Sequence, residues 1–313
     1  MTQAAEMPER CAGIVTYNPD MERLLANLQA IVPQVDYVYL CDNGSTNVTQ
    51  IEELTTDFGT VSLEKLGANK GIATALNHLL NSAHGAGYAW IITLDQDSVA
   101  SAGMVDALAT YAGERIGLVC PFILDRNRMT LEEYHAKRLP ETEQVTKGAK
   151  RGAITSGALT QVKAALQVGG FDDRMFIDYV DFDFNERLLL AGYEIVRVNT
   201  TYLLHEKGKS ERTWLRVPRS TSSGREWQPL YKLGYSPNRC YYQARNRIVY
   251  WKKYRHHTGT EGITELPLLM GLSLLTEDHK MAKLGAYMRG IHDGLHTKVR
   301  PVHNEDLQGK VNA

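Results

Sequence analysis

The chain has 313 residues, of which 43% are hydrophobic and 23% charged, the balance of an ordinary globular protein with a sizeable core. Its 35 Lys and Arg residues against 36 Asp and Glu residues give a formal net charge of −1, without the basic excess of nucleic-acid-binding proteins. The four cysteines are far apart and form no C-x-x-C pair, so neither a zinc ribbon nor a thioredoxin-like motif is predicted. No signal peptide and no apolar stretch of about 18 residues is recognisable, and we expect a cytoplasmic location.

The first 125 residues alternate between short apolar runs and stretches with helical spacing. Strands are predicted near residues 11–18, 35–45, 61–67 and 88–97, and the segment GIATALNHLLNSA between the last two repeats its apolar residues three and four apart. Alternating strands and helices are typical of right-handed crossovers. The sequence therefore predicts an α/β fold with a Rossmann-like, mostly parallel sheet and helices on both faces.

Polar residues follow several of these predicted strands. They are Thr16, Tyr17 and Asn18 after the first strand, Asp42 after the second, and Asp95 and Asp97 after the strand near residue 90. Open α/β sheets bind ligands beyond the carboxyl ends of their strands, so a site is expected at this edge. No G-x-G-x-x-G follows the first strand and no G-x-x-x-x-G-K-[ST] is present, which disfavours a dinucleotide site and a P-loop.

The stretch LDQDS contains two aspartates separated by one glutamine at a strand exit. Asp95 and Asp97 can both reach a hard divalent cation, and Mg²⁺ often uses only one or two protein carboxylates together with substrate phosphates. The alternative is a solvated strand end, because Asp-x-Asp on its own is a weak motif. The other acidic and basic residues must decide between them.

A second acidic group lies within FIDYVDFDFNERLLLAG. Asp178, Asp181 and Asp183 repel one another, which raises the proton affinity of at least one of them. Capping of a helix start is the alternative for Asp181 and Asp183, but it accounts for one acidic residue better than for three. The intervening aromatic residues indicate a partly buried site in which a carboxylate can act as a general base.

His205 ends the predicted strand VNTTYLLH and is followed by Lys207 and Lys209. A lone histidine is more often structural than a ligand, and lysines are more often solvated. At a strand end, however, this combination suits metal ligation or contact with phosphate oxygens.

Seven segments occur together in one order: VTYN, CDNGST, NKGIATALN, LDQDS, ITSGALT, GGFDDRMFIDYVDFDFNERLLLAGYEI and HEKG. This ordered set, from residue 11 to about residue 210, resembles the family 2 glycosyltransferases of the GT-A fold, most closely their rhamnosyltransferase branch. The remaining residues match loosely through YYQARNRIVYWKKY, which is similar to the family's Arg-Asn segment.

The resemblance implies a role for each matching residue. The nucleotide-sugar contacts would be Thr16, Tyr17, Asn18, Asp42, Asn69, Lys70, Gly71, Asn77, Asp95 and Gly157. The metal ligands would be Asp97 and His205, with Asp95 as a further candidate, and the diphosphate contacts would be Lys207 and Arg245. Asp181 would be the catalytic base; Asp178 is the second choice, because Val180 stands where many members carry Glu. Arg187 matches the arginine usual on the following helix.

The implied activity is that of an inverting hexosyltransferase dependent on Mg²⁺ or Mn²⁺. The expected donor is dTDP-rhamnose, and the expected acceptor is a hydroxyl of a saccharide or polyprenyl-linked saccharide in bacterial cell-surface polysaccharide synthesis. UDP-galactofuranose and UDP-hexoses remain alternative donors. From other classes, a nucleotidyltransferase would need a Gly-rich basic loop that VTYNPDMERLL lacks, and a non-catalytic carbohydrate-binding protein would not need the carboxylates.

The expected domains are a GT-A domain over residues 1–210, a loop or flap over 211–237 and a helical C-terminal region over 238–313. Within the first, residues 1–125 would form the nucleotide half and 126–210 the acceptor half. Basic and aromatic residues are interleaved after residue 238, which suits a peripheral contact with the inner face of the cell membrane. A packing face or a homo-oligomer interface is the alternative.

Overall fold

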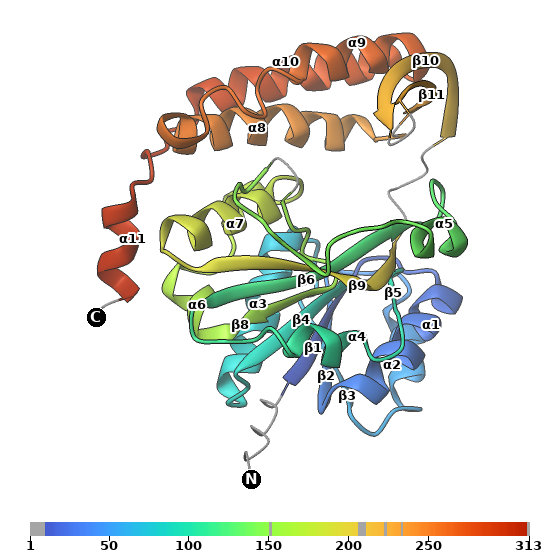
Figure 1. Cartoon of the computed structure of the whole chain (residues 1–313), viewed down its shortest axis with the longest axis vertical. Helices are drawn as coiled ribbons and strands as arrows, with labels where there is room; N and C mark the ends of the chain where they lie inside the picture. Colours follow the sequence, from blue (N-terminus) through green and yellow to red (C-terminus); the bar gives the residue numbers. More distant parts are fainter. Residues whose placement is uncertain (1–9, 150–151, 206–210, 222–223, 233, 312–313) are drawn as a thin grey trace. The chain divides into compact units, whose positions relative to one another are not determined.

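The computed structural model describes residues 10–149, 152–205, 211–221, 224–232 and 234–311. The chain forms two compact units (Figure 1). The first contains residues 1–205 together with 302–313, and the second contains residues 206–301. The chain therefore returns to the first unit at its C-terminal end.

A nine-stranded sheet forms the centre of the first unit, in the order β3-β2-β1-β4-β8-β6-β9-β5, with β7 also paired to β9. The parallel part consists of β1 (Arg10–Thr16), β2 (Tyr37–Asp42), β3 (Val61–Lys65) and β4 (Trp90–Asp95). The other strands are β5 (Val99–Ala100), β6 (Ile116–Asp125), β7 (Thr142–Gln144), β8 (Ala158–Gln161) and β9 (Glu194–His205). Among these other strands, β6 and β9 are parallel to each other, whereas β8 is antiparallel to both of its neighbours, β4 and β6. The α/β class is confirmed, with a parallel first half and a mixed second half.

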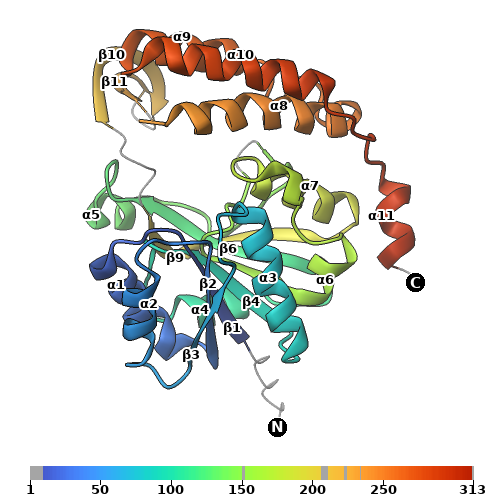
Figure 2. The same cartoon turned by 180° about the vertical axis from the view of Figure 1, so that it is seen from behind.

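Helices cover both faces of this sheet (Figures 1 and 2). The helices of the first unit are α1 (Met21–Ile31), α2 (Val48–Thr55), α3 (Ile72–Gly85), α4 (Met104–Ala109), α5 (Leu131–His135), α6 (Val162–Gln167), α7 (Val180–Leu190) and α11 (Asn304–Val311). The buried side chains of α1, α2 and α4 form the main core with one face of β1, β2 and β4. On the opposite face, α3 packs closely on β1, because a Cβ at Gly13 would lie 3.0 Å from Cδ1 of Leu79.

The second unit contains a hairpin of β10 (Glu211–Thr221) and β11 (Gly224–Lys232), and the helices α8 (Pro237–Thr258), α9 (Leu266–Thr276) and α10 (Lys280–His296). The expectation of a loop over 211–237 is therefore wrong for residues 211–232. Arg212, Trp214 and Arg216 are exposed and alternate with half-buried residues, the period of a strand. A register shift between Arg212 and Arg216 and two prolines, Pro218 and Pro229, obscure this period in the sequence.

The C-terminal region is also divided differently from expectation. Helix α8 begins at Pro237 after Ser236, whose side chain accepts a hydrogen bond from the N–H of Arg239 at 3.3 Å. Helix α11 packs against α6 and α7 and belongs to the first unit. None of the helices that the structure describes has both the length and the apolar character needed to cross a bilayer.

Glycines allow α8 and α10 to pack closely in the second unit. A Cβ on Gly290 would overlap the carbonyl oxygen of Tyr241, and one on Gly294 would lie 2.9 Å from the carbonyl oxygen of Arg245. On the same helix, a Cβ on Gly285 would meet only Nη1 of Arg289, at 3.6 Å. Close approach of the two backbones is therefore required at one side of α10 and not at the other.

Replacing Gly290 by Ala should loosen the contact between α8 and α10. The overlap with Tyr241 should cost about 1–3 kcal/mol, which exceeds the gain of up to about 1 kcal/mol from removing a helical glycine. Hydrogen exchange of α8 and α10 in Gly290→Ala should therefore be faster than in the unchanged protein. Gly285→Ala is the matched control and should leave exchange unchanged or slower; equal exchange in the two variants would contradict this packing.

Candidate active site

The exit of β4 is fixed from two sides. The side chain of Gln96 accepts a hydrogen bond from the N–H of Tyr17 at 2.7 Å and donates one to the carbonyl oxygen of Tyr17 at 3.3 Å. Asn27 on α1 donates to the carbonyl oxygen of Asp95 at 2.7 Å. The glutamine between the two aspartates thus binds the end of β4 to the end of β1.

A chain of hydroxyl groups connects His205 to the same strand end. Nδ1 of His205 lies 3.0 Å from Oγ of Ser98, which is 2.8 Å from Oγ of Ser156. Oγ of Ser156 accepts a hydrogen bond from the N–H of Asp95 at 3.0 Å, and Oδ2 of Asp95 lies 3.9 Å from Nδ1 of His205. The end of β9 and the end of β4 therefore meet. Because Nδ1 is held by Ser98, Nε2 of His205 is the ring nitrogen left for a ligand.

The residues at this point fit a divalent cation. Asp97 is half-buried, and its side chain makes no hydrogen bond or ion pair within the described part of the chain. His205 is held through Nδ1 by a hydroxyl group, as metal-binding histidines usually are through their second nitrogen. Among the described residues, no group of three or more His, Cys, Asp or Glu side chains is placed to hold a metal. Two protein ligands are sufficient for Mg²⁺ when substrate phosphates supply the others.

The turn after β2 is shaped by the buried carboxylate of Asp42. It accepts hydrogen bonds from Oγ1 of Thr16 at 3.3 Å, from the N–H of Gly44 at 3.1 Å and from the N–H of Ser45 at 3.0 Å. Oδ1 of Asn18 accepts a further bond across the two loops from the N–H of Thr46, at 2.8 Å. Asp42 is therefore directed at the backbone of its own turn, whereas the side chain of Tyr17 is 46% exposed beside it.

The loop before α3 is fixed by two asparagines. Oδ1 of Asn43 accepts from the N–H of Lys70 at 2.8 Å, and Oδ1 of Asn69 accepts from the N–H of Gly71 at 3.0 Å. Gly71 has a φ of +88°, and a Cβ there would lie 2.6 Å from Cδ2 of Phe176. Only glycine suits both constraints. The loop over residues 69–71 therefore lies directly against the segment that carries the acidic group.

That acidic segment has an unusual backbone. Phe176, Asp178 and Tyr179 have φ values of +58°, +63° and +67°, a region that non-glycine residues seldom adopt. The carbonyl oxygen of Phe176 accepts a hydrogen bond from the N–H of Ile72 at 2.7 Å, which connects the segment to the start of α3. Strained backbone of this kind persists only where the surroundings hold it, and it is concentrated at functional sites.

Asp181 lies in the first turn of α7, directly after the strained segment. Desolvation by the surrounding protein is the main cause that raises its pKa to about 7, against the hydrogen bond from the N–H of Phe182, and the charges of Asp178 and Asp95 raise it further. The charge of Asp95 is among these causes, so the end of β4 lies in the neighbourhood of the start of α7. A carboxyl group with a pKa near neutrality is suited to general base catalysis.

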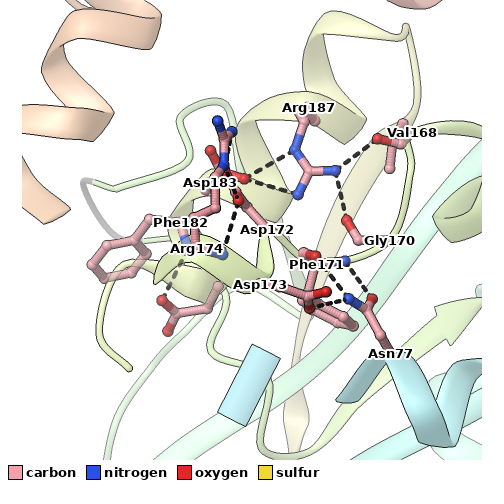
Figure 3. Close-up of polar contacts among 11 residues, drawn as sticks. Asn77, Val168, Gly170, Phe171, Asp172, Asp173, Arg174, Phe182, Asp183 and Arg187 are labelled. Carbon is pink, nitrogen blue, oxygen red and sulfur yellow. Dashed lines mark hydrogen bonds and ion pairs between the residues drawn. The ribbon is translucent and has the colours of Figure 1, made fainter. Parts of the chain in front are cut away.

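Asp183 and Arg187 form a buried ion pair within α7 (Figure 3). Oδ2 of Asp183 accepts from Nη2 of Arg187 at 2.8 Å and from Nε at 3.0 Å. Nη1 of the same arginine donates to the carbonyl oxygens of Val168 and Gly170, at 2.7 and 2.6 Å. These two residues therefore attach α7 to the turn that precedes the acidic segment.

Asn77 on α3 holds the other side of that turn (Figure 3). Its Nδ2 donates to the carbonyl oxygen of Phe171 at 2.8 Å and to Oδ1 of Asp173 at 2.6 Å, and its Oδ1 accepts from the N–H of Phe171 at 2.7 Å. The resemblance implied a contact with the nucleotide sugar for this residue. In the structure, the polar atoms of the side chain are engaged in connecting α3 to residues 171–173.

Three further residues were expected in the site: Gly157, Lys207 and Arg245. Gly157 has a φ of +81°, and a Cβ there would lie 3.0 Å from Pro121 and 3.1 Å from Leu203, so the close approach is to the sheet itself. Lys207 lies outside the described residues. Arg245 is on α8 in the second compact unit, where its Nη1 donates to Oδ1 of Asn246 at 2.8 Å.

Several residues with positioning roles were not singled out from the sequence. Gln96, Ser98 and Ser156 stand next to expected site residues in LDQDS and TSG, and Asn43 is a polar residue at the end of the second predicted strand to which no role was given. Adjacency to the motifs was the available signal. The partners of these side chains lie tens of residues away, so their roles become apparent only in the folded chain.

Residues 11–168 match the pattern of glycosyl transferase family 2, which covers half of the chain. The chain belongs to this family and is a glycosyltransferase. It is similar in particular to rhamnosyltransferases. It is 30% identical over 252 residues to the dTDP-rhamnosyl transferase RfbF of Shigella flexneri, which covers 77% of this chain and 79% of that protein. It is also 30% identical over 238 residues to the N-acetylglucosaminyl-diphospho-decaprenol L-rhamnosyltransferase of Mycobacterium tuberculosis, covering 63% and 75%.

Solved structures share the fold. The S. aureus TarS 1-349 complex with UDP-GlcNAc matches 92% of this chain and 81% of that chain, with a TM-score of 0.55 and 13% identity. GalNAc-T7 with UDP, GalNAc and Mn²⁺ matches 93% of this chain and 58% of that chain, with a TM-score of 0.54 and 15% identity. At these identities the likeness concerns the fold, and the GT-A fold is confirmed.

Replacing Arg187 by Ala should destabilise the first unit. It would leave the carboxylate of Asp183 buried without its cation, a change that costs about 3–5 kcal/mol. Arg174→Ala is the matched control, because Arg174 pairs with Asp172 but its side chain is 60% exposed, and such a pair contributes about 1 kcal/mol or less. Urea unfolding measures both. If Arg187→Ala were as stable as Arg174→Ala and lost only donor binding, Arg187 would be a ligand contact rather than a support.

Proposed function

We propose that the protein is an inverting rhamnosyltransferase that moves rhamnose from dTDP-rhamnose to an acceptor hydroxyl, with Asp181 as the general base. The observation that carries the proposal is the position of Asp181, which has a pKa of about 7 and is affected by the charge of Asp95 at the end of β4. The names of the two relatives support rhamnose, and one of them supports the dTDP donor.

The acceptor hydroxyl has to lose a proton as its oxygen attacks the anomeric carbon. An unprotonated Asp181 can accept that proton, and a base with a pKa near the working pH combines the correct protonation state with a sufficient driving force. Attack from the side opposite the leaving nucleotide inverts the anomeric configuration. Asp178 remains the second choice for the base; it lies in the strained segment with a φ of +63°.

The departing nucleoside diphosphate develops negative charge in a site that already contains several carboxylates. Mg²⁺ or Mn²⁺ would be held by Asp97 and by Nε2 of His205, with Asp95 as a further ligand, and would neutralise that charge. Asp95 and Ser98 orient His205 for this task. Lys207 and Arg245 are proposed as additional diphosphate contacts.

The other residues proposed to contact the nucleotide sugar are those that the motifs predict. Thr16, Tyr17, Asn18 and Asp42 lie at the ends of β1 and β2, and Asn69, Lys70 and Gly71 lie in the loop before α3. Tyr17 is the exposed one among the first group. Asn77 and Gly157, in contrast, are proposed to act through the backbone that they position. The side chain of Asn77 makes hydrogen bonds to residues 171–173, and Gly157 lies close to Pro121 and Leu203.

The acceptor is proposed to be a saccharide or a polyprenyl-linked saccharide of bacterial cell-surface polysaccharide synthesis, met at the cytoplasmic face of the membrane. The decaprenol-linked substrate in the name of the second relative supports this acceptor class. A UDP-sugar donor is the second candidate. It is less favoured, because the UDP-containing neighbours share only 13–15% identity with this chain.

Asp181→Asn should retain donor binding and lose transfer by about 10²–10⁴-fold, the usual contribution of a positioned base. In the unchanged enzyme, kcat should fall as the pH is lowered through about 7, because Asp181 becomes protonated there and can no longer accept a proton. Steady-state rates between pH 5.5 and 8.5 measure this, at roughly a tenfold loss per pH unit below the pKa.

Asp178→Asn is the matched control for the base. It removes a neighbouring negative charge, so it should lower the pKa of Asp181 and shift the pH profile toward acid while retaining turnover. Near-normal turnover of Asp181→Asn together with an inactive Asp178→Asn would transfer the role of base to Asp178.

With Mn²⁺ present, dTDP-rhamnose should raise the melting temperature by several degrees, because a ligand at about 100 times its Kd stabilises by about 2.7 kcal/mol. UDP-glucose and UDP-galactofuranose should give smaller shifts. Asp97→Asn should lose the part of the shift that depends on Mn²⁺. An equal or larger shift with a UDP-sugar would replace rhamnose, and an unchanged Mn²⁺ effect in Asp97→Asn would remove Asp97 from the metal site.

A further inference from the structure

The two compact units carry opposite charge. Residues 206–301 contain 18 Lys and Arg residues but only 8 Asp and Glu residues, a net charge of +10. The whole chain contains 35 Lys and Arg residues and 36 Asp and Glu residues. The first unit therefore contains 17 basic and 28 acidic residues, a net charge of −11. Such an asymmetry indicates an anionic partner for the basic unit.

The basic unit also exposes a line of large apolar side chains on α10. Met281, Met288 and Leu295 follow one another at intervals of seven residues, so they lie on one face of the helix. They are 76%, 54% and 55% exposed. Lys280 and Arg289, the sequence neighbours of two of them, are exposed as well. Helix α10 therefore exposes a line of apolar side chains to water, with basic side chains next to it.

The hairpin of β10 and β11 exposes two tryptophans. Trp214 and Trp227 are 79% and 66% exposed, unusual values for so large an apolar side chain. On β10, Trp214 stands in the sequence between Arg212 and Arg216, which are exposed as well. Trp and Arg together are typical of elements at a membrane–water interface.

Helix α9 connects these two surfaces. It contains no charged residue, and Leu268 and Leu275, again seven residues apart, are 64% and 61% exposed. It contacts both α10 and β11, and both figures show α9 and α10 along the same side of α8 within this unit. The hairpin, α9 and α10 are therefore neighbouring elements of one basic unit, and each exposes large apolar side chains.

We propose that residues 206–301 bind the surface of an anionic lipid bilayer through the hairpin, α9 and α10. Basic residues attract the unit to anionic headgroups, and the exposed Trp, Leu and Met side chains enter the interface. A second copy of the chain suits this surface less well, because pairing the same face of two units would bring two charges of +10 together. This proposal does not depend on which nucleotide sugar is the donor or on which aspartate is the catalytic base.

The test uses the full chain and vesicles without substrate. The protein should co-sediment with phosphatidylcholine vesicles that contain phosphatidylglycerol at about a third of the lipid, and on the order of tenfold less with pure phosphatidylcholine. Added salt should weaken binding, since it screens the attraction. Tryptophan fluorescence should shift to shorter wavelength on binding, and Trp214→Phe/Trp227→Phe should lose most of that shift, because of the other two tryptophans Trp90 is buried and Trp251 is half-buried on α8.

Two kinds of variant separate the apolar and the basic contributions. Met281→Glu/Met288→Glu should lower vesicle binding on the order of tenfold, and Lys280→Glu/Lys298→Glu should lower it for anionic vesicles. Leu131→Glu, a 41% exposed leucine of the first unit, is the matched control and should bind normally. Circular dichroism confirms that each variant is folded.

Three results would overturn the proposal. One is the absence of sedimentation with anionic vesicles, and another is equal binding to pure phosphatidylcholine. The third is a dimer in light scattering that Met281→Glu/Met288→Glu converts to a monomer, which would assign the face to a second copy.

Discussion

The ion pair between Asp183 and Arg187 is the contact on which the position of α7 in the first unit depends. Both charges are buried, and the arginine also donates to the carbonyl oxygens of Val168 and Gly170. From the other side, Asn77 holds residues 171–173. The positive φ values over residues 176–179 are locally unfavourable, so they require support from outside the segment. The anchors hold the preceding residues 168–173, and the N–H of Ile72 supports the segment directly by donating to the carbonyl oxygen of Phe176 at 2.7 Å. Asp181 follows the segment in the first turn of α7, where desolvation raises its pKa.

The site itself is a meeting of strand ends that are distant in sequence. Gln96 fixes the end of β4 to that of β1, and the hydroxyls of Ser98 and Ser156 fix it to the end of β9 at His205. This network separates the two aspartates in role. Asp95 lies 3.9 Å from His205 and affects the pKa of Asp181, whereas the side chain of Asp97 has no partner among the described residues. A rigid Asp95 and an available Asp97 suit a site that receives a cation together with its substrate.

Strands β1 to β4 could be predicted from the sequence because each is a short apolar run that ends at a polar turn. The hairpin could not, since Pro218, Pro229 and the register shift near Arg212 obscure its period of two. For the proposed site, the ordered motifs predict roles for Asp95, Asp97, Asp181 and His205, but they do not predict what neighbouring side chains do. Ser98 and His205 are 107 residues apart, and Asn77 is 94 residues from Phe171. Such partners follow from tertiary structure, which local spacing does not contain.

The formal charge of −1 is an average of two unlike units. The first unit has an excess of acidic residues, and the place proposed for an anionic donor lies beside Asp95, Asp97 and Asp181, so a cation between them would offset the repulsion. In the second, basic residues accompany exposed Trp, Leu and Met side chains, whose exposure to water is unfavourable unless another apolar phase covers them. A near-zero total therefore reflects cancellation. Each unit taken alone has the charge that its own proposed partner requires: a cation for the acidic one and an anionic surface for the basic one.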